Sequence, residues 1–183
     1  MTALIVINIQ NDYCTGSMAI PGALDIIPKI NKIRDKFDYI FFVQDSFSKY
    51  HQQFFDKTVK FPYCIKDTYG EKIPSGIITK SYDTYITKGN LNMHNADSAF
   101  YNSEGNNKKE TYLKFHLNMK NISEIYLCGN YFEKTIFPTA IDGYRLGYNV
   151  NIIKNITTYI DENNMDRGLK YLETLNIPIV DLS

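Results

Sequence analysis

The sequence predicts an α/β protein with three layers, in which helices cover both faces of a mostly parallel, doubly wound sheet. Strand-like and helix-like runs alternate along the whole chain, which is typical of parallel strands joined by helical crossovers. The strand-like runs are rich in β-branched and aromatic residues and show little polar alternation, as expected for strands buried on both faces. With 183 residues, the chain fits one domain, which we expect to span residues 1–183.

Six runs have the composition of strands, namely residues 3–9, 39–43, 82–87, 124–128, 149–153 and 178–180. Four runs have helical spacing, namely residues 23–36, 108–119, 133–146 and 163–175. The first of these has one apolar stripe, formed by Leu24, Ile27, Ile30 and Ile33. Gly147 follows the third run closely, at the position where a helix C-cap is expected.

The region 46–107 is long and rich in Tyr, Asn, Gly and Ser, and only 82–87 within it resembles a strand. Long excursions in such folds lie outside the carboxyl ends of the strands, where ligands also bind. We therefore expect the functional site at that edge of the sheet.

Composition excludes several classes of partner. Lys plus Arg and Asp plus Glu both total 20, and the formal net charge is zero, so nothing favours nucleic acid or an anionic membrane. The apolar runs are shorter than the roughly 20 residues of a membrane span. Cys14, Cys64 and Cys128 lack the spacing of a disulfide framework or structural zinc site, and we interpret them as small core residues. Since no leader pattern is visible either, we expect a cytoplasmic protein.

Polar side chains at the expected strand ends are the candidate site residues. They are Asn8, Gln10, Asp12, Asp45 and His51 after the first two strands, and Lys88 after the run at 82–87. An Asp and a His in one loop can bind a divalent metal, although two ligands seldom hold one. Most loop lysines are solvated, so the residues alone leave the role of Lys88 open.

Six segments, in this order, resemble the isochorismatase-like cysteine hydrolase superfamily, which includes nicotinamidases and isochorismatases. They are "ALIVINIQNDYCTGSMAIPGA", "FFVQDSFSKYHQQF", "FPYC", "ITKGN", "DSAFYNSEG" and "YLCGNYFEKTIFPTAIDGYRLGYNVNII". The corresponding family opening is of the type ALIVIDVQNDF. The resemblance covers nearly the whole chain and implies the same fold, a hydrolase ancestry and assembly into dimers or tetramers.

The resemblance also implies a catalytic triad of Asp, Lys and Cys, and only the lysine is retained, as Lys88. The Asp position is Asn8, and the Cys position is Thr135. An amide side chain cannot act as a general base, and a threonine hydroxyl is a weak nucleophile without one. The family chemistry should therefore be lost.

The family metal site is depleted in the same way. Its Asp and three His positions match Asp45, Phe47, His51 and Tyr63. Phe47 cannot bind a metal, and a neutral tyrosine binds one poorly. We expect no cofactor; a divalent metal such as zinc stays an alternative with an incomplete ligand set, to which His94 is the candidate addition.

The resemblance implies that the backbone around the family's nucleophile position is retained. The family places a cis peptide before its nucleophile, which would fall at Asn130-Tyr131, and uses backbone N–H groups there as an oxyanion hole. Tyr131 and Thr135 would supply these donors. The remaining pocket residues would be Gln10, Phe47, Tyr63 and Phe132, and their aromatic character suits a small planar ligand, although a filled and closed pocket is an equal alternative.

Three readings of function follow from these substitutions. The first is a catalytically inactive homologue with a residual ligand pocket or a protein-binding role. The second is a hydrolase of a small planar amide or vinyl ether, in which Asp12 or Asp45 replaces the missing acid. The third is a structural subunit of an oligomer, marked by an exposed apolar patch on a helix.

Overall fold

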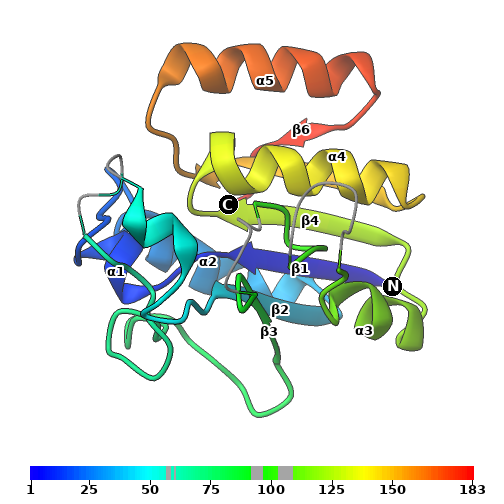
Figure 1. Ribbon diagram of the computed structural model, residues 1–183. Coiled ribbons are helices and arrows are strands. Elements are labelled where there is room, and N and C mark those ends of the chain that lie inside the picture. The colour runs from blue at the N-terminus through cyan, green and yellow to red at the C-terminus, as the bar shows by residue number, and fades with distance from the viewer. Residues whose placement is uncertain (57–58, 60, 92–96, 103–108) are drawn as a thin grey trace.

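The computed structural model describes residues 1–56, 59, 61–91, 97–102 and 109–183. These residues form a six-stranded sheet, parallel throughout, with the strand order β3-β2-β1-β4-β5-β6 (Figure 1). The strands are β1 (Thr2–Ile7), β2 (Tyr39–Asp45), β3 (Thr84–Lys88), β4 (Glu124–Gly129), β5 (Asn149–Thr157) and β6 (Ile179–Val180). The predicted fold class and all six predicted strands are confirmed, although β1 ends two residues earlier than expected and β5 continues to Thr157.

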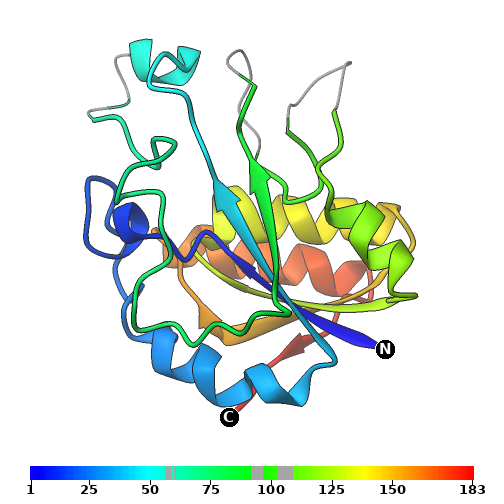
Figure 2. The ribbon, with the colours of Figure 1, turned by 90° about the horizontal axis from the view of Figure 1, so that it is seen from below.

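Helices cover both faces of the sheet, as Figures 1 and 2 show. The α-helices are α1 (Asn11–Cys14), α2 (Ile26–Ile33), α3 (Leu113–Met119), α4 (Phe137–Arg145) and α5 (Glu162–Thr174). Shorter turns are η1 (Arg34–Lys36), η2 (Gln52–Phe55) and the π-helical η3 (Phe132–Ile136). The helix predicted at 133–146 therefore begins as a π-helical turn and becomes α-helical at Phe137. Gly147, at φ +87°, follows its C-cap as predicted.

Two apolar cores lie between these layers. On one face, Ile27, Ile30 and Ile33 of the predicted stripe pack on side chains of β1, β2 and β5, whereas Leu24, also predicted in the stripe, precedes α2 and is 52% exposed. On the other face, α3, α4 and α5 pack on the opposite side chains of the same strands. Because successive strand residues point to opposite faces, Leu4 and Val6 join the first core while Ile5 and Ile7 join the second.

The excursion between β2 and β3 is tied to the helix layer by a buried ion pair. Arg34 Nη2 lies 2.8 Å from Asp83 Oδ1, and both side chains are buried. Arg34 also donates to the carbonyl oxygen of Ile78. The turn η2, which follows β2, lies beyond the carboxyl end of that strand, as Figure 2 shows.

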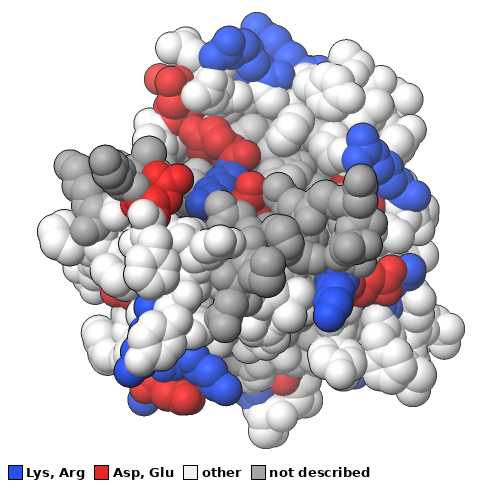
Figure 3. Space-filling view, in the orientation of Figure 1, with Lys and Arg blue, Asp and Glu red and all other residues white. Residues whose placement is uncertain are grey.

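The surface carries no dominant charge of one sign on the face seen in Figure 3, where positive and negative side chains are interspersed. This distribution agrees with the net charge of zero. Among the described residues, no helix has the length and apolar character that crossing a membrane requires.

Candidate functional site

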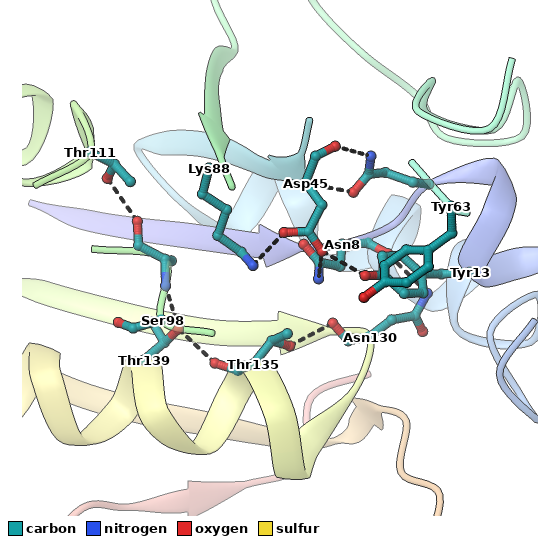
Figure 4. Close-up of polar contacts among 12 residues, drawn as sticks. Asn8, Tyr13, Asp45, Tyr63, Lys88, Ser98, Thr111, Asn130, Thr135 and Thr139 are labelled. Carbon is teal, nitrogen blue, oxygen red and sulfur yellow. Dashed lines mark hydrogen bonds and ion pairs between the residues drawn. The ribbon is translucent and has the colours of Figure 1, made fainter. Parts of the chain in front are cut away.

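Three sequence-predicted residues meet where neighbouring strands end. Asp45 and Lys88 are the last residues of β2 and β3 and pair with each other in the sheet register. Asn8 follows directly after β1, which lies beside β2. Because all three strands run in parallel, their carboxyl ends bring these side chains to one edge, where they converge in Figure 4.

Asp45 is the centre of the polar contacts in this group. Its Oδ1 accepts a hydrogen bond of 2.6 Å from Lys88 Nζ. Its Oδ2 accepts one of 2.8 Å from Asn8 Nδ2 and one of 2.6 Å from the hydroxyl of Tyr13. Asp45 and Lys88 are 3% and 1% exposed, and a buried ion pair is tolerated only with good geometry and additional hydrogen bonds of this kind.

Asn8 is held in a conformation that few residues adopt. Its φ is +55°, in the left-handed region that asparagine tolerates better than most residues. Its N–H donates to the carbonyl oxygen of Val43, and its own carbonyl oxygen accepts from Asn130 Nδ2 at 3.1 Å. The chain therefore turns sharply at the end of β1 and directs the Asn8 carboxamide at Asp45.

Gln10 does not belong to the pocket, which corrects the sequence prediction. Its Nε2 donates to the carbonyl oxygens of Asp45 and Glu71, and its Oε1 accepts from the Asp45 N–H at 2.8 Å. These bonds fix the backbone at the end of β2. Asp12 also points elsewhere, since its Oδ2 accepts from the Cys64 N–H at 2.7 Å.

Thr135 has its hydroxyl directed at the backbone. The Oγ1 atom lies 2.7 Å from the carbonyl oxygen of Asn130 and 2.9 Å from that of Tyr131, as Figure 4 shows in part. The Thr135 N–H donates to the carbonyl oxygen of Tyr131. The predicted role of this N–H as an oxyanion donor is therefore wrong for this conformation, because its hydrogen is already bonded within the π-helical turn.

Two further expectations for this turn are corrected. The peptide bond between Asn130 and Tyr131 is not cis. Phe132 is not a pocket residue: it is 1% exposed, belongs to the core between the sheet and α5, and its ring centroid lies 5.9 Å from that of Phe137. A core position for Phe132 follows from the π-helical turn, which directs it toward Gly168 of α5.

A small cavity lies between these groups. Its walls include Lys88, Thr135, Phe47 and Tyr63, and its volume is about 10 Å³, roughly what the centre of one water molecule requires. Tyr131, which was predicted as a pocket residue, is partly exposed and is not among the residues that line this cavity. Among the described residues, the space between the lining side chains therefore matches about one water molecule.

Aromatic side chains, Phe47 and Tyr63, stand at two of the four positions that match the family's metal ligands. The Phe47 ring centroid lies 5.0 Å from that of His51, 5.4 Å from that of Tyr63 and 5.8 Å from that of Phe54. His51 is 1% exposed, and its Nδ1 accepts from the N–H of Gln53 at 3.3 Å. Among the described residues, no group of three or more His, Cys, Asp or Glu side chains is arranged to hold a metal. His94 lies outside the described residues.

Burial and the negative charge of Asp45 raise the pKa of two tyrosines that line the cavity, Tyr13 and Tyr63. The pKa of Tyr13 is raised well above its ordinary value, first by burial and then by the charge of Asp45. The same two causes raise the pKa of Tyr63. Both phenols therefore act as neutral hydrogen-bond donors at physiological pH.

Sequence reasoning missed Tyr13 and Asn130. Asn130 is fully buried, and it joins the ends of three strands because its side chain donates to Asn8 and accepts from the Thr158 hydroxyl at 2.9 Å. The signal for Tyr13 was present in the family opening, where "QNDY" stands in place of "QNDF". One added hydroxyl at that position supplies a buried donor.

Known proteins resemble this chain over its whole length. A family model described as the isochorismatase domain matches residues 2–183. A nicotinamidase from Acinetobacter baylyi is 30% identical over 180 residues, which cover 88% of this chain and 83% of the relative. The solved pyrazinamidase of Pyrococcus horikoshii in complex with zinc has a TM-score of 0.86 at 26% identity and covers 99% of each chain. Yeast nicotinamidase bound to the inhibitor nicotinaldehyde has a TM-score of 0.89 at 22% identity over 100% of each chain, a likeness that shows the fold alone.

Proposed function

Since the chain belongs to the isochorismatase domain family, we propose that it is a catalytically inactive member that keeps the fold without the cysteine-dependent amidase chemistry. The observation that carries this proposal is the set of contacts around Asp45. Its carboxylate accepts hydrogen bonds from Lys88, Asn8 and Tyr13. The retained lysine is therefore one partner of a structural ion pair.

The contacts of Thr135 support the same conclusion. A hydroxyl that attacks a carbonyl carbon needs a base that accepts its proton. Here the Thr135 hydroxyl donates to backbone carbonyl oxygens of its own turn, and the residue at the family base position is an amide. Neither a proton acceptor nor an activated nucleophile is therefore available at the matched positions.

The cavity lined by Phe47, Tyr63 and Lys88 is what remains of the predicted ligand pocket. Its volume of about 10 Å³ admits a water molecule but no planar amide. We therefore propose that the protein acts in the cytoplasm without catalysing a reaction. Binding of a small molecule larger than water would require the ring of Phe47 or Tyr63 to move.

The test uses nicotinamide and pyrazinamide, because the similar proteins are a nicotinamidase and a pyrazinamidase. Purified protein is incubated with nicotinamide and with pyrazinamide, and acid formation is followed by chromatography beside the Lys88→Ala variant. The proposal predicts the same background for both proteins. Acid formation by the wild type that the Lys88→Ala substitution abolishes would overturn it.

A hydrolase with altered catalytic residues is the alternative that this test also detects. Of the two replacement acids considered from the sequence, Asp12 is turned to the Cys64 N–H. Asp45 does line the cavity, but three donors already occupy its carboxylate. Its position favours a structural role over proton transfer to a substrate.

A role as subunit of a homo-oligomer is a second candidate, because α3 exposes an apolar stripe. Tyr112, Phe115 and Met119 are 75%, 56% and 68% exposed and recur at helical spacing on the side of α3 opposite Leu113 and Leu117. Size-exclusion chromatography with light scattering tests this role. A dimer or tetramer that becomes monomeric in Phe115→Lys/Met119→Lys would support it, and a monomeric wild type would exclude it.

A further inference from the structure

Tyr13 and Lys88 both donate hydrogen bonds to the carboxylate of Asp45, which matches a metal ligand of the family. We propose that these two side chains replace a divalent cation as the partners of Asp45, and that the aromatic cluster Phe47, Phe54 and Tyr63 fills the volume that a cation and its water would need. The chain would then be stable without a metal at this position. This inference concerns metal binding and does not depend on the proposed loss of amidase activity.

Three donors already bond the carboxylate of Asp45. A carboxylate offers about four lone-pair positions, and here Lys88, Asn8 and Tyr13 use three of them at 2.6 to 2.8 Å. The remaining position is on Oδ1, which already bonds the Lys88 ammonium, so a cation bound there at typical coordination distance would be repelled by that charge unless it displaced Lys88. Each displaced donor would be left buried, which costs free energy.

The charges that line the cavity are already balanced. Asp45 and Asp97 contribute two negative charges to its lining, and Lys88 and Lys134 contribute two positive ones. With asparagine at position 8, the matched family position adds no further carboxylate. A divalent cation would therefore add an uncompensated charge of +2 to a largely buried site, which is strongly unfavourable.

The ring of Phe47 is packed closely by its neighbours. Its ring lies against His51, Tyr63 and Phe54, and on the remaining side it lies against Gly89. A Cβ atom at Gly89 would fall 2.3 Å from Phe47 Cε1, and Gly89 has a φ of +74°. The glycine thus provides the space for the ring, and the ring occupies the position that an imidazole would need to serve as a ligand.

His51 is the one imidazole at the four positions that match the family's metal ligands. His51 uses its Nδ1 to accept from Gln53 at 3.3 Å. A structural zinc site takes four ligands, usually thiolates and imidazoles. The described residues therefore offer too few ligands, and the ones they offer already have partners within the protein.

Metal content is the direct test. The protein is dialysed against excess Zn²⁺, desalted, and its zinc measured by plasma mass spectrometry, with thermal unfolding followed as a function of zinc concentration. We expect clearly substoichiometric zinc and an unchanged midpoint. One zinc per chain that is lost in both His51→Ala and Asp45→Asn would overturn the proposal. Zinc that both variants retain is bound elsewhere and agrees with it.

The matched gain-of-function variant is Phe47→His/Tyr63→His, which places two imidazoles beside His51 and Asp45. If the rings have replaced ligands, a folded double variant retains zinc and its unfolding midpoint rises with zinc concentration. A folded double variant that takes up no zinc would contradict the assignment of these rings. If circular dichroism shows that the double variant does not fold, the wild-type measurement with His51→Ala decides.

Discussion

The Nδ2 of Asn8 donates a 2.8 Å hydrogen bond to the Oδ2 of Asp45, in the interior of the protein where both side chains are almost completely buried. This bond joins the end of β1 to the end of β2 and leaves Asp45 as the partner of Lys88. The charges of Asp45 and Lys88 balance each other, and the Asn8 carboxamide links this pair to the end of β1.

The Asn8→Asp variant should be less stable, because it replaces a hydrogen-bond donor with a second carboxyl group against Asp45. Aspartate tolerates the positive φ of this position about as well as asparagine, so the change is mainly electrostatic. Two carboxyl groups at this distance share one proton. We expect a loss of about 3 kcal/mol or more in the free energy of unfolding at pH 7.

The pH dependence gives this prediction its sharpest form. The folded variant holds a proton that the unfolded chain releases above pH of about 4, so the folded state binds more protons and its stability falls as pH rises. Urea unfolding at pH 5 and pH 7.5 measures the difference between variant and wild type. A deficit that does not grow with pH would show that the two carboxyl groups do not interact.

The Tyr13→Phe variant should lose the shortest hydrogen bond to Asp45 Oδ2, at 2.6 Å, with little change in shape. Hydrogen bonds to charged groups contribute about 1.5–3 kcal/mol, and we expect a loss in that range by urea unfolding. Tyr126→Phe is the matched control, since its hydroxyl bonds to a partly exposed Glu124. Equal losses in the two variants would contradict the special role of Tyr13.

Breaking the Arg34–Asp83 pair should be costly, because both side chains are buried. Arg34→Met leaves the Asp83 carboxylate buried and without its partner guanidinium, and we expect a loss of about 3–5 kcal/mol. The double variant Arg34→Met/Asp83→Leu should recover much of this loss. Lys80→Ala, which removes an ion pair to the exposed Asp35, should change the unfolding midpoint little.

The three thiols should be inert in the folded protein. Burial raises the pKa of Cys14 to about 11, against an opposing hydrogen bond from Asn130, and burial raises the pKa of Cys64 and Cys128 as well. We expect no reaction with Ellman's reagent at pH 8 and reaction of all three thiols in denaturant.

The same pKa shift makes alkaline stability depend on Cys14. Its folded pKa lies above the ordinary value of 9.0, so its contribution is complete below pH of about 9 and is lost as pH rises toward about 11. The Cys14→Ala variant should therefore show a shallower decline of stability across this window. An identical decline in variant and wild type would mean that Cys14 does not titrate there.

The sequence indicated the sheet well because its strands are buried on both faces, which leaves unbroken apolar runs such as that of β4. It also brought Asn8, Asp45 and Lys88 to one edge, since residues at the ends of parallel strands meet there. The directions of the side chains depended on contacts far apart in the chain. Gln10 follows Asn8 closely, yet it bonds to the backbone at positions 45 and 71, and no local pattern encodes that choice.

The errors around Thr135 have a similar origin. A turn between a strand and a helix was evident from the sequence, but its π-helical form was not. That form uses the Thr135 N–H within the turn and directs Phe132 into the core. The small volume of the cavity likewise depends on the packing of Phe47, Phe54 and Tyr63, whose rings are brought together by the fold.

Ammonia release from nicotinamide tests the central claim most directly, namely that the family's amidase chemistry is absent from this site. Wild type and Lys88→Ala are assayed at high protein concentration over long incubation, with a cysteine-containing nicotinamidase as the positive control. We predict that wild type releases ammonia at the rate of Lys88→Ala, at least about 10³-fold below the control. Release by the wild type that is clearly faster than by Lys88→Ala and saturates with nicotinamide would contradict the claim.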